Sequence, residues 1–221
     1  MNPLMINWNT LDTVLLDMDG TLLDLEFDNW FWQRHVPEQY ALARGQEYAQ
    51  AEPYVQGWID RYRGTLEWYS LDFWSNQLDL DLAALKRAAA DRIRIRPGAE
   101  NFLRALAASG RRVLLVTNAH RAALTVKLER TGIDRYFEAM ISSHDYGHAK
   151  EEQAFWQRLH EQHPFVPQRT LLVDDSLPVL HSGQRYGLGQ LVSILQPDSS
   201  LPVRDNTDPF PAISNFSLVL P

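Results

Sequence analysis

The sequence contains no cysteine, and its basic residues are almost all arginine, with 18 arginines beside three lysines. Without cysteine, disulfide bonds and thiolate metal sites are excluded. No stretch approaches the roughly 18 consecutive apolar residues that a membrane-spanning helix needs. The first residues also lack the basic and then apolar pattern of a secretory signal. We therefore expect a cytoplasmic protein with no membrane-bound part.

The sequence also lacks an excess of positive charge. Its net charge is -7 and its pI is about 5.5, which argues against binding to nucleic acid or to anionic lipid. Small anionic substrates stay possible because local charge can oppose the net charge. With 221 residues, 45% of them hydrophobic, the chain is long enough for one sizeable core and a smaller insertion.

The sequence VLLDMDGTLL, residues 14–23, is the feature around which the chain is organised. An apolar strand ends there in Asp17 and Asp19, two residues apart, so their side chains lie on one face of an extended strand. Gly20 allows a sharp turn directly afterwards. Two like charges at this distance repel each other, which indicates a shared cation or a shared proton.

Further strands and helices alternate through the second half of the chain. Amphipathic helical segments separate the short apolar runs, which predicts parallel strands with helices on both faces, an α/β Rossmann-like sheet of five β units. The tail from residue 196 holds five of the 12 prolines, and we expect little regular structure there. The expected strands after the first are residues 113–116, 139–142, 170–173 and 191–194.

Residues 25–91 have a different character and predict an all-helical inserted domain, with residues 1–24 and 92–221 forming the α/β core domain. Thirteen of the 24 aromatic residues fall between Phe27 and Trp74. Several apolar residues recur at helical spacing, which predicts one continuous helix face, and Asp79 is expected to cap the next helix. The residues of this face are Trp58, Tyr62, Leu66, Tyr69 and Phe73.

Polar residues follow three of the predicted strands at their carboxyl ends, where open parallel sheets bind ligands. Asp17 and Asp19 end the first strand, Thr117 and Asn118 the second, and Asp174 and Asp175 the fourth. Lys150 follows the third strand at the start of a helix, where the helix dipole disfavours a cation, so we expect it to have an acidic partner. We expect solvent-exposed helix faces to explain the other two lysines, Lys86 and Lys127.

The ordered set DMDGT, TN, a single lysine and DD resembles the four motifs of the haloacid dehalogenase (HAD) superfamily, most of whose members are magnesium-dependent phosphatases. The resemblance covers about residues 10–25 and 95–195, and the insertion is similar to the helical cap of type-one-capped members. The segments LLDMDGTLLDL, WYSLDFWS, TNAH, VKLERTG and FWQRL also resemble the purine 5′-nucleotidase branch, which acts on GMP and IMP.

The resemblance implies hydrolysis of a phosphomonoester through an aspartyl-phosphate. Asp17 is then the nucleophile, and Asp19 protonates the leaving group and later activates water. Thr117, Asn118 and Lys150 hold the phosphoryl group and offset its charge. The implied Mg²⁺ ligands are Asp17, the backbone carbonyl of Asp19, Asp174 and Asp175.

Two positions depart from the family pattern. Glu151 follows the motif lysine where many members have proline, and Val179 stands where a longer form of the fourth motif has its second acid. The second departure leaves open how Asp174 and Asp175 divide the metal coordination.

Several residues allow both a functional and a structural interpretation. His120 is either a substrate contact or a helix cap, and His144 and His148 are either metal ligands or exposed loop residues. The aromatic face of the insertion is interpreted as its own core. We expect one or two cap aromatics to face the site, with Trp30, Trp32 and Trp68 as the candidates. Arg61 and Arg63 are either contacts to a base or phosphate or, as we expect, part of solvated helix faces.

The sequence thus predicts a monomeric or homodimeric phosphatase for a small phosphorylated substrate, most simply a purine nucleoside monophosphate. The alternatives are a sugar-phosphate phosphatase or phosphomutase of the same superfamily and a catalytically silent phosphate-binding scaffold. Hinges near Leu25 and residues 91–96 would let the cap open and close.

Overall fold

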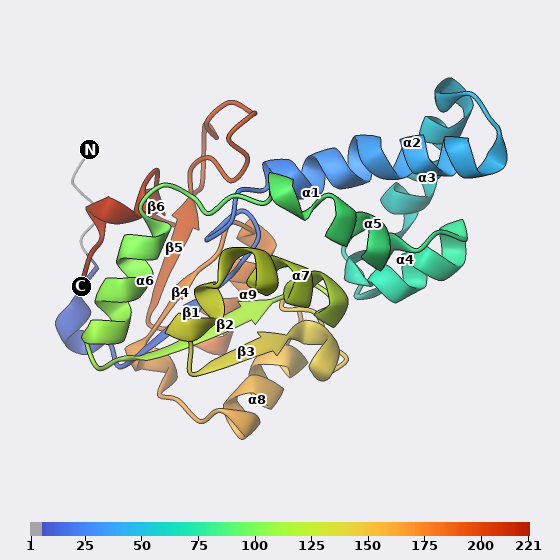
Figure 1. The fold of residues 1–221 in the computed structure, drawn as a ribbon. Helices are drawn as coiled ribbons and strands as arrows, with labels where there is room; N and C mark the ends of the chain where they lie inside the picture. Colours follow the sequence, from blue (N-terminus) through green and yellow to red (C-terminus); the bar gives the residue numbers. More distant parts are fainter. Residues whose placement is uncertain (1–5) are drawn as a thin grey trace.

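A computed structural model describes residues 6–221 and contains a six-stranded parallel sheet in the order β3-β2-β1-β4-β5-β6 (Figure 1). The predicted α/β Rossmann-like fold with a helical insertion is confirmed. The strands are β1 (Thr13–Leu16), β2 (Arg112–Thr117), β3 (Ala139–Ser142), β4 (Thr170–Val173), β5 (Gln190–Ile194) and β6 (Ala212–Ile213).

The α-helices fall into two groups, those between β1 and β2 and those that accompany the sheet. The first group is α1 (Glu26–Trp30), α2 (Val36–Arg44), α3 (Tyr48–Tyr62), α4 (Leu71–Leu78) and α5 (Leu82–Ala88). The second group is α6 (Ala99–Ala108), α7 (Arg121–Thr131), α8 (Gln153–Gln162) and α9 (Leu177–Tyr186). No helix within residues 6–221 is long and apolar enough to cross a membrane.

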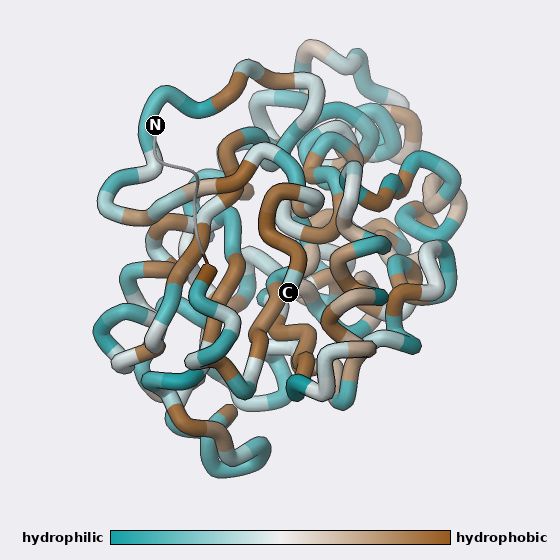
Figure 2. The backbone as a smooth tube through the Cα atoms, turned by 90° about the vertical axis from the view of Figure 1, so that its left-hand side faces the viewer, coloured by the Kyte–Doolittle hydropathy of each residue, from teal (hydrophilic) through white to brown (hydrophobic). Residues whose placement is uncertain are grey.

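The sheet is buried on both faces, which explains why its strands are continuous apolar runs. Leu16 of β1 packs on one face with Phe102 of α6 and Leu124 of α7, whereas its neighbour Leu15 packs on the other face with Trp156 of α8. Figure 2 shows hydrophobic segments gathered in the interior, while the outer loops are mostly hydrophilic. This core fixes the strand ends at which the polar residues lie.

The five helices between β1 and β2 project to one side of the sheet and form the cap (Figure 1). Their core includes Phe31, Val55, Ile59, Leu71 and Trp74. Trp58, Tyr62 and Phe73 pack against it, as expected for the aromatic residues of the insertion, whereas Tyr69 contacts Glu151 outside the cap. A π-helical turn, residues 31–35, joins α1 to α2 into one long helical segment. The boundaries of the cap at residues 25 and 91 stay a prediction.

Two local predictions in the cap are wrong. The expected single helix face from Trp58 to Phe73 is broken, because Gly64 adopts a positive φ of 85° between the end of α3 and the start of α4. Asp79 does not cap α5 but ends α4 in the left-handed conformation; Asp81 is the cap, accepting a hydrogen bond from the Ala84 amide at 2.9 Å. Spacing alone did not reveal the break at Gly64.

The carboxyl-terminal tail is more tightly held than its proline content suggested. It adds β6, which pairs with β5, and the Arg96 guanidinium donates to the carbonyl of Pro197 at 3.0 Å. Apart from β6 and a 3-10 turn at Phe216–Leu218, residues 196–221 have no regular structure, which agrees with the expectation of little regular structure there. The tail also brings Arg204 next to Asp175, the second residue after β4.

Candidate active site

The carboxyl ends of β1, β2 and β4 lie side by side and bring the predicted motif residues together. Leu16 is paired with Leu115 of β2 and with Val173 of β4. Asp17 and Asp174 directly follow these paired residues, and Thr117 lies two residues beyond Leu115 on β2. The parallel register therefore places residues from three distant parts of the sequence at one edge of the sheet.

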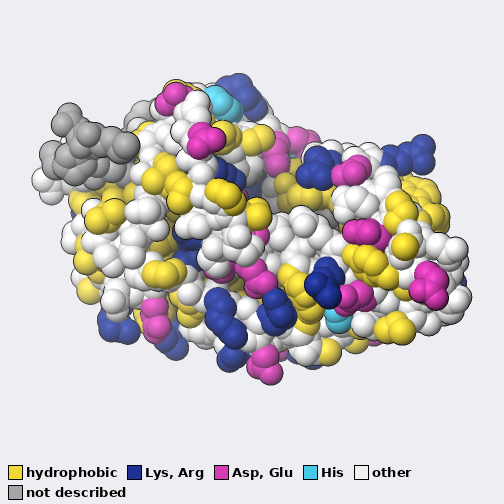
Figure 3. Space-filling model, turned by 90° about the horizontal axis from the view of Figure 1, so that it is seen from above, with side chains coloured by type: hydrophobic (Ala, Val, Ile, Leu, Met, Phe, Trp, Pro, Cys, Tyr) yellow, Lys and Arg dark blue, Asp and Glu magenta, His cyan; other side chains and the backbone are white. Residues whose placement is uncertain are grey.

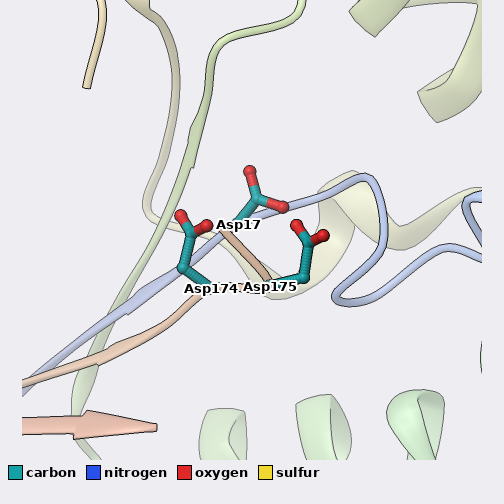
Figure 4. A group of neighbouring side chains, drawn as sticks. All are labelled: Asp17, Asp174 and Asp175. Atoms are coloured by element: carbon teal, nitrogen blue, oxygen red, sulfur yellow. The ribbon is translucent and has the colours of Figure 1, made fainter. Parts of the chain in front are cut away.

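Three carboxylates gather at this edge. Oxygens of Asp17, Asp174 and Asp175 lie within 4.8 Å of one another, and Figure 4 shows their side chains converging above the ends of β1 and β4. Hard oxygen ligands in this arrangement suit a divalent cation such as Mg²⁺ or Ca²⁺. Gly20 makes room for them, because a Cβ atom there would lie 2.7 Å from Cγ of Asp175.

Lys150 joins two of these carboxylates. Its Nζ donates to Asp17 Oδ1 at 2.6 Å and to Asp174 Oδ2 at 2.7 Å, and the lysine is only 2% exposed. The third donor position reaches the carbonyl of Val116 at 3.1 Å. Lys150 therefore has two acidic partners, Asp17 and Asp174, where the sequence predicted one.

Burial and charge repulsion perturb the titration of this cluster. Burial raises the pKa of Asp17 to about 6 against the opposing charge of Lys150. Burial, together with the charges of Asp17 and Asp174, raises the pKa of Asp175 well above its ordinary value. Burial disfavours the charged lysine, but the two carboxylates outweigh it and hold the pKa of Lys150 above the usual range. Three acids and one lysine leave negative charge that a cation would offset.

The residues after β2 are tied to the loop that carries Lys150. The Asn118 Oδ1 atom accepts the Lys150 amide at 2.9 Å, and the Asn118 amide group donates to Glu151 at 2.9 Å. Thr117 is buried at the cavity wall and accepts the Ala119 amide at 3.0 Å. Glu151 also accepts the Tyr69 hydroxyl of the cap at 3.0 Å, so the residue in place of the family's proline links cap and core.

The expectation for the other two lysines was wrong. Lys86 and Lys127 are 2% and 1% exposed, and both line the same cavity as the acids. Lys127 Nζ lies 2.6 Å from Asp19 Oδ2 and 2.7 Å from Asp28 Oδ2, and Lys86 Nζ lies 2.6 Å from Asp28 Oδ1. A helical pattern shows which face of a helix is apolar, but it does not show that acids from another segment meet a lysine on that face.

The lysine contacts act to lower the pKa values of both acids, but burial outweighs them at Asp19 and not at Asp28. Burial raises the pKa of Asp19 to about 6, although Lys127 opposes the shift. Burial also acts to raise the pKa of Asp28, but its two lysine partners outweigh burial and lower that pKa to about 2. Asp28 is thus held as a carboxylate, whereas Asp19 titrates close to neutral pH.

A cavity of about 600 Å³ lies between cap and core and contains these residues on its wall. This volume is in the range of small-molecule sites. Of the three tryptophans considered from the sequence, Trp32 and Trp68 line the cavity and Trp30 does not. Arg63 also lines it, stacked over Trp68 at 5.8 Å, although its side chain is 62% exposed as expected for a solvated helix face.

Arg204 is a cavity residue that the sequence gave no reason to select. It lies within the proline-rich tail, and its guanidinium donates to the carbonyl of Asp175 and lies 3.4 Å from that side chain. Arg61, by contrast, lies over Trp58 at 5.6 Å and is absent from the cavity wall.

The three histidines considered from the sequence, His120, His144 and His148, lie outside the cluster of Asp17, Asp174 and Asp175. His120 caps α7, and its ring accepts the Ala122 amide at 3.4 Å, as one of the two interpretations predicted. His148 is partly exposed and lies 3.0 Å from Glu152, and His144 packs edge-on against His120. Figure 3 shows acidic, basic and hydrophobic side chains interspersed over one face of the molecule, without a continuous basic patch.

Comparison with known proteins agrees with this geometry. The family model described as haloacid dehalogenase-like hydrolase matches residues 11–187. The GMP/IMP nucleotidase YrfG of Escherichia coli is 39% identical over 216 residues, which cover 98% of this chain and 97% of that protein. A phosphorylated carbohydrates phosphatase of Thermotoga maritima is 20% identical over 84% of this chain and 86% of its own length.

The fold is also similar to that of solved structures. A HAD phosphatase from Thermococcus onnurineus superimposes with a TM-score of 0.78 at 22% identity, over 94% of this chain and 95% of that one. The family match over residues 11–187 and the 39% identity to the nucleotidase over nearly the full length of both chains confirm the resemblance drawn from the four motifs. The chain belongs to the haloacid dehalogenase-like hydrolase family.

Proposed function

We propose that this protein is a Mg²⁺-dependent 5′-nucleotidase that hydrolyses purine nucleoside monophosphates such as GMP and IMP. The observation that carries the chemistry is the buried Lys150 bridge between Asp17 and Asp174, beside Asp175 and at the wall of the cavity between cap and core. The substrate follows from the near full-length relationship to a protein described as a GMP/IMP nucleotidase. A purine nucleotide also suits a cavity with tryptophan walls.

Asp17 attacks phosphorus in the first step. Lys150 holds one of its oxygens and leaves the other for the bond to phosphorus, while the ester bond breaks and Asp19 donates a proton to the leaving oxygen. In the second step Asp19 takes a proton from water, which attacks the phosphorus of the aspartyl-phosphate and regenerates Asp17. The pKa of Asp19, raised to about 6, suits a group that is both acid and base.

The phosphoryl oxygens are held by Thr117, by the amides that follow it, by Asn118 and by Lys150. Asp17, Asp174, Asp175 and the carbonyl of Asp19 form the metal-binding set, and three of these carboxylates already lie within 4.8 Å of one another. A bound Mg²⁺ supplies positive charge that offsets the phosphate and the carboxylates. Arg204 fixes Asp175 through its contacts to that residue.

The test is phosphate release from a panel of nucleoside monophosphates, sugar phosphates and an aryl phosphate, with Mg²⁺ or with EDTA. We expect metal-dependent release concentrated on GMP and IMP, and none from Asp17→Asn. The matched control is Asp12→Asn, which changes an exposed aspartate just before the opposite end of β1 and leaves release unchanged.

The other outcomes separate the alternatives. Release concentrated on sugar phosphates keeps the catalytic residues and overturns the nucleotide substrate, a result consistent with the relationship to a carbohydrate phosphatase. Silence across the panel with retained binding of phosphate overturns the enzyme and favours the scaffold. Turnover of the aryl phosphate excludes a phosphomutase that shields its intermediate from water. A nucleotide substrate fits the cytoplasmic location expected from the sequence, and gel filtration tests the proposed monomer or homodimer.

A further inference from the structure

The described residues contain a chain of four alternating charges, two buried lysines and two partly buried aspartates, that the proposed reaction does not explain. It runs Lys86, Asp28, Lys127, Asp19, with contacts of 2.6, 2.7 and 2.6 Å. Lys86 is on α5 and Asp28 on α1, both in the cap, whereas Lys127 is on α7 of the core. The chain therefore begins in the cap, crosses to the core and ends at the acid/base.

The surroundings leave these charges few other partners. The Lys86 Nζ lies 4.9 Å from the ring of Phe31 and 5.4 Å from that of Phe27, so aromatic rings rather than water surround it. Buried ion pairs contribute little net stability, because desolvation of both charges offsets their attraction, and apolar residues of similar volume often serve as well. Stability alone is thus a weak reason for four such residues in the wall of a reaction cavity.

The two oxygens of Asp19 have different surroundings. Oδ2 is held by Lys127, whereas Oδ1 is shielded from solvent and has no hydrogen-bond partner among residues 6–221. Asp19 also lines the cavity. The 19% of the Asp19 side chain that is exposed therefore belongs to atoms other than Oδ1. The contact to Lys127 fixes the orientation of the whole carboxyl group, which is what proton donation to a leaving group requires.

We propose that Lys127 is a positioning residue that holds Asp19 through Oδ2 and so fixes its carboxyl group relative to the leaving oxygen of the substrate, while the cap residues Asp28 and Lys86 keep Lys127 in place. The inference rests on the proposed phosphomonoesterase function. As the bond from Asp17 to phosphorus forms and the ester P–O bond breaks, the proton on the Asp19 carboxyl group passes to the ester oxygen. The cap arrangement that encloses the substrate thereby also fixes the acid.

The test compares kcat/KM for two kinds of ester. An aryl phosphate such as p-nitrophenyl phosphate has a leaving group that departs readily without a proton, whereas the alkoxide of an alkyl phosphate does not. The alkyl ester used is whichever nucleoside monophosphate or sugar phosphate of the panel above the wild type hydrolyses fastest. The parameter kcat/KM reports the steps up to transfer to Asp17, so the later role of Asp19 as a base does not enter it.

For Lys127→Met we expect kcat/KM to fall about 100-fold on the alkyl ester and less than about fivefold on the aryl ester, since a general acid contributes roughly 10²–10⁴-fold. The second variant, Asp28→Leu with Lys86→Met, removes one charge of each sign and leaves Lys127 and Asp19 unchanged. We expect it to lower the alkyl-to-aryl ratio about tenfold. If Lys127→Met does not fold, this variant decides by the same ratio.

Equal losses on both esters, or an unchanged ratio, would overturn the positioning role, because a structural defect reduces both activities alike. Failure of the proposed function has a different signature. In that case the wild type hydrolyses neither ester, or Asp17→Asn hydrolyses them as well as the wild type does.

Discussion

Replacing Asp28 by asparagine tests the energetics of the chain of charges. The side chain of Asp28 is 14% exposed and accepts from both Lys86 and Lys127. Asp28→Asn leaves Lys86 buried without an anionic partner, and removing one member of a buried ion pair costs about 3–5 kcal/mol. We therefore expect the variant to lose about 3 kcal/mol of unfolding free energy at pH 7.

The same residue predicts how that difference depends on pH. The pKa of Asp28 is about 2 in the folded protein and 3.8 in the reference state, so its ionised form favours folding. This stability is present above pH 4 and is lost as the pH falls toward 2. The linkage relation gives a loss of about 1 kcal/mol by pH 3 and about 2 kcal/mol by pH 2.

Urea unfolding from pH 7 to pH 3 measures both effects. The difference between wild type and Asp28→Asn should be about 3 kcal/mol at pH 7 and about 2 kcal/mol at pH 3. Asp60→Asn is the matched control, since Asp60 pairs with Arg63 at 2.7 Å but is 55% exposed. An exposed pair contributes less than about 1 kcal/mol. If the difference in unfolding free energy between wild type and Asp28→Asn at pH 7 is as small as that for Asp60→Asn, the buried-charge argument is refuted. If the difference does not change with pH, the lowered pKa of Asp28 is refuted.

Three further predictions concern the cavity. Gly20→Ala should cost about 1–2 kcal/mol in unfolding free energy and at least 100-fold in kcat/KM, because the new Cβ meets the Asp175 carboxylate; Gly45→Ala, also at positive φ but in open space, should show only the stability loss in parallel melts and assays. Trp68→Ala should raise the KM for GMP about 10-fold and leave that for ribose 5-phosphate nearly unchanged, since stacking on a base contributes about 1–3 kcal/mol; equal effects on both would count against stacking. Tyr69→Phe removes a hydrogen bond from cap to core and should lower kcat/KM up to tenfold without changing the melting temperature by more than about 3 °C.

The sequence could predict the sheet and the acidic cluster because both depend on local patterns joined by one simple rule. Each apolar run is a strand, and parallel pairing places the carboxyl ends at one edge. Asp17, Thr117 and Asp174 follow such runs, so their proximity is a consequence of topology. Lys150 was identifiable because it is one of only three lysines and was expected at the start of a helix, where the helix dipole disfavours a cation; α8 in fact begins three residues later, at Gln153.

The contacts between cap and core could not be predicted in the same way. Lys127 lies on a helix whose apolar pattern is satisfied without it, and its partner Asp28 is 99 residues away in a different domain of the predicted division. Arg204 is in a tail with no periodicity at all. The scarcity of lysine was a usable signal: where arginine supplies nearly all surface cations, each of three lysines is worth testing as a buried one.

The positions of Asp19 and Asp28 couple the cap to the proposed acid/base. Both belong to the segment between β1 and the end of α1, so they lie on either side of the predicted hinge near Leu25. Lys127 holds both carboxylates, which means that a movement of α1 away from the core separates Lys127 from Asp28 and removes one of the two contacts that fix its ammonium group. Substitutions of cap residues such as Trp32 and Trp68 can therefore alter the substrate without affecting the proposed acid. Asp28, in contrast, has to be kept together with Lys127 if Asp19 is to be fixed only when the cap encloses a substrate.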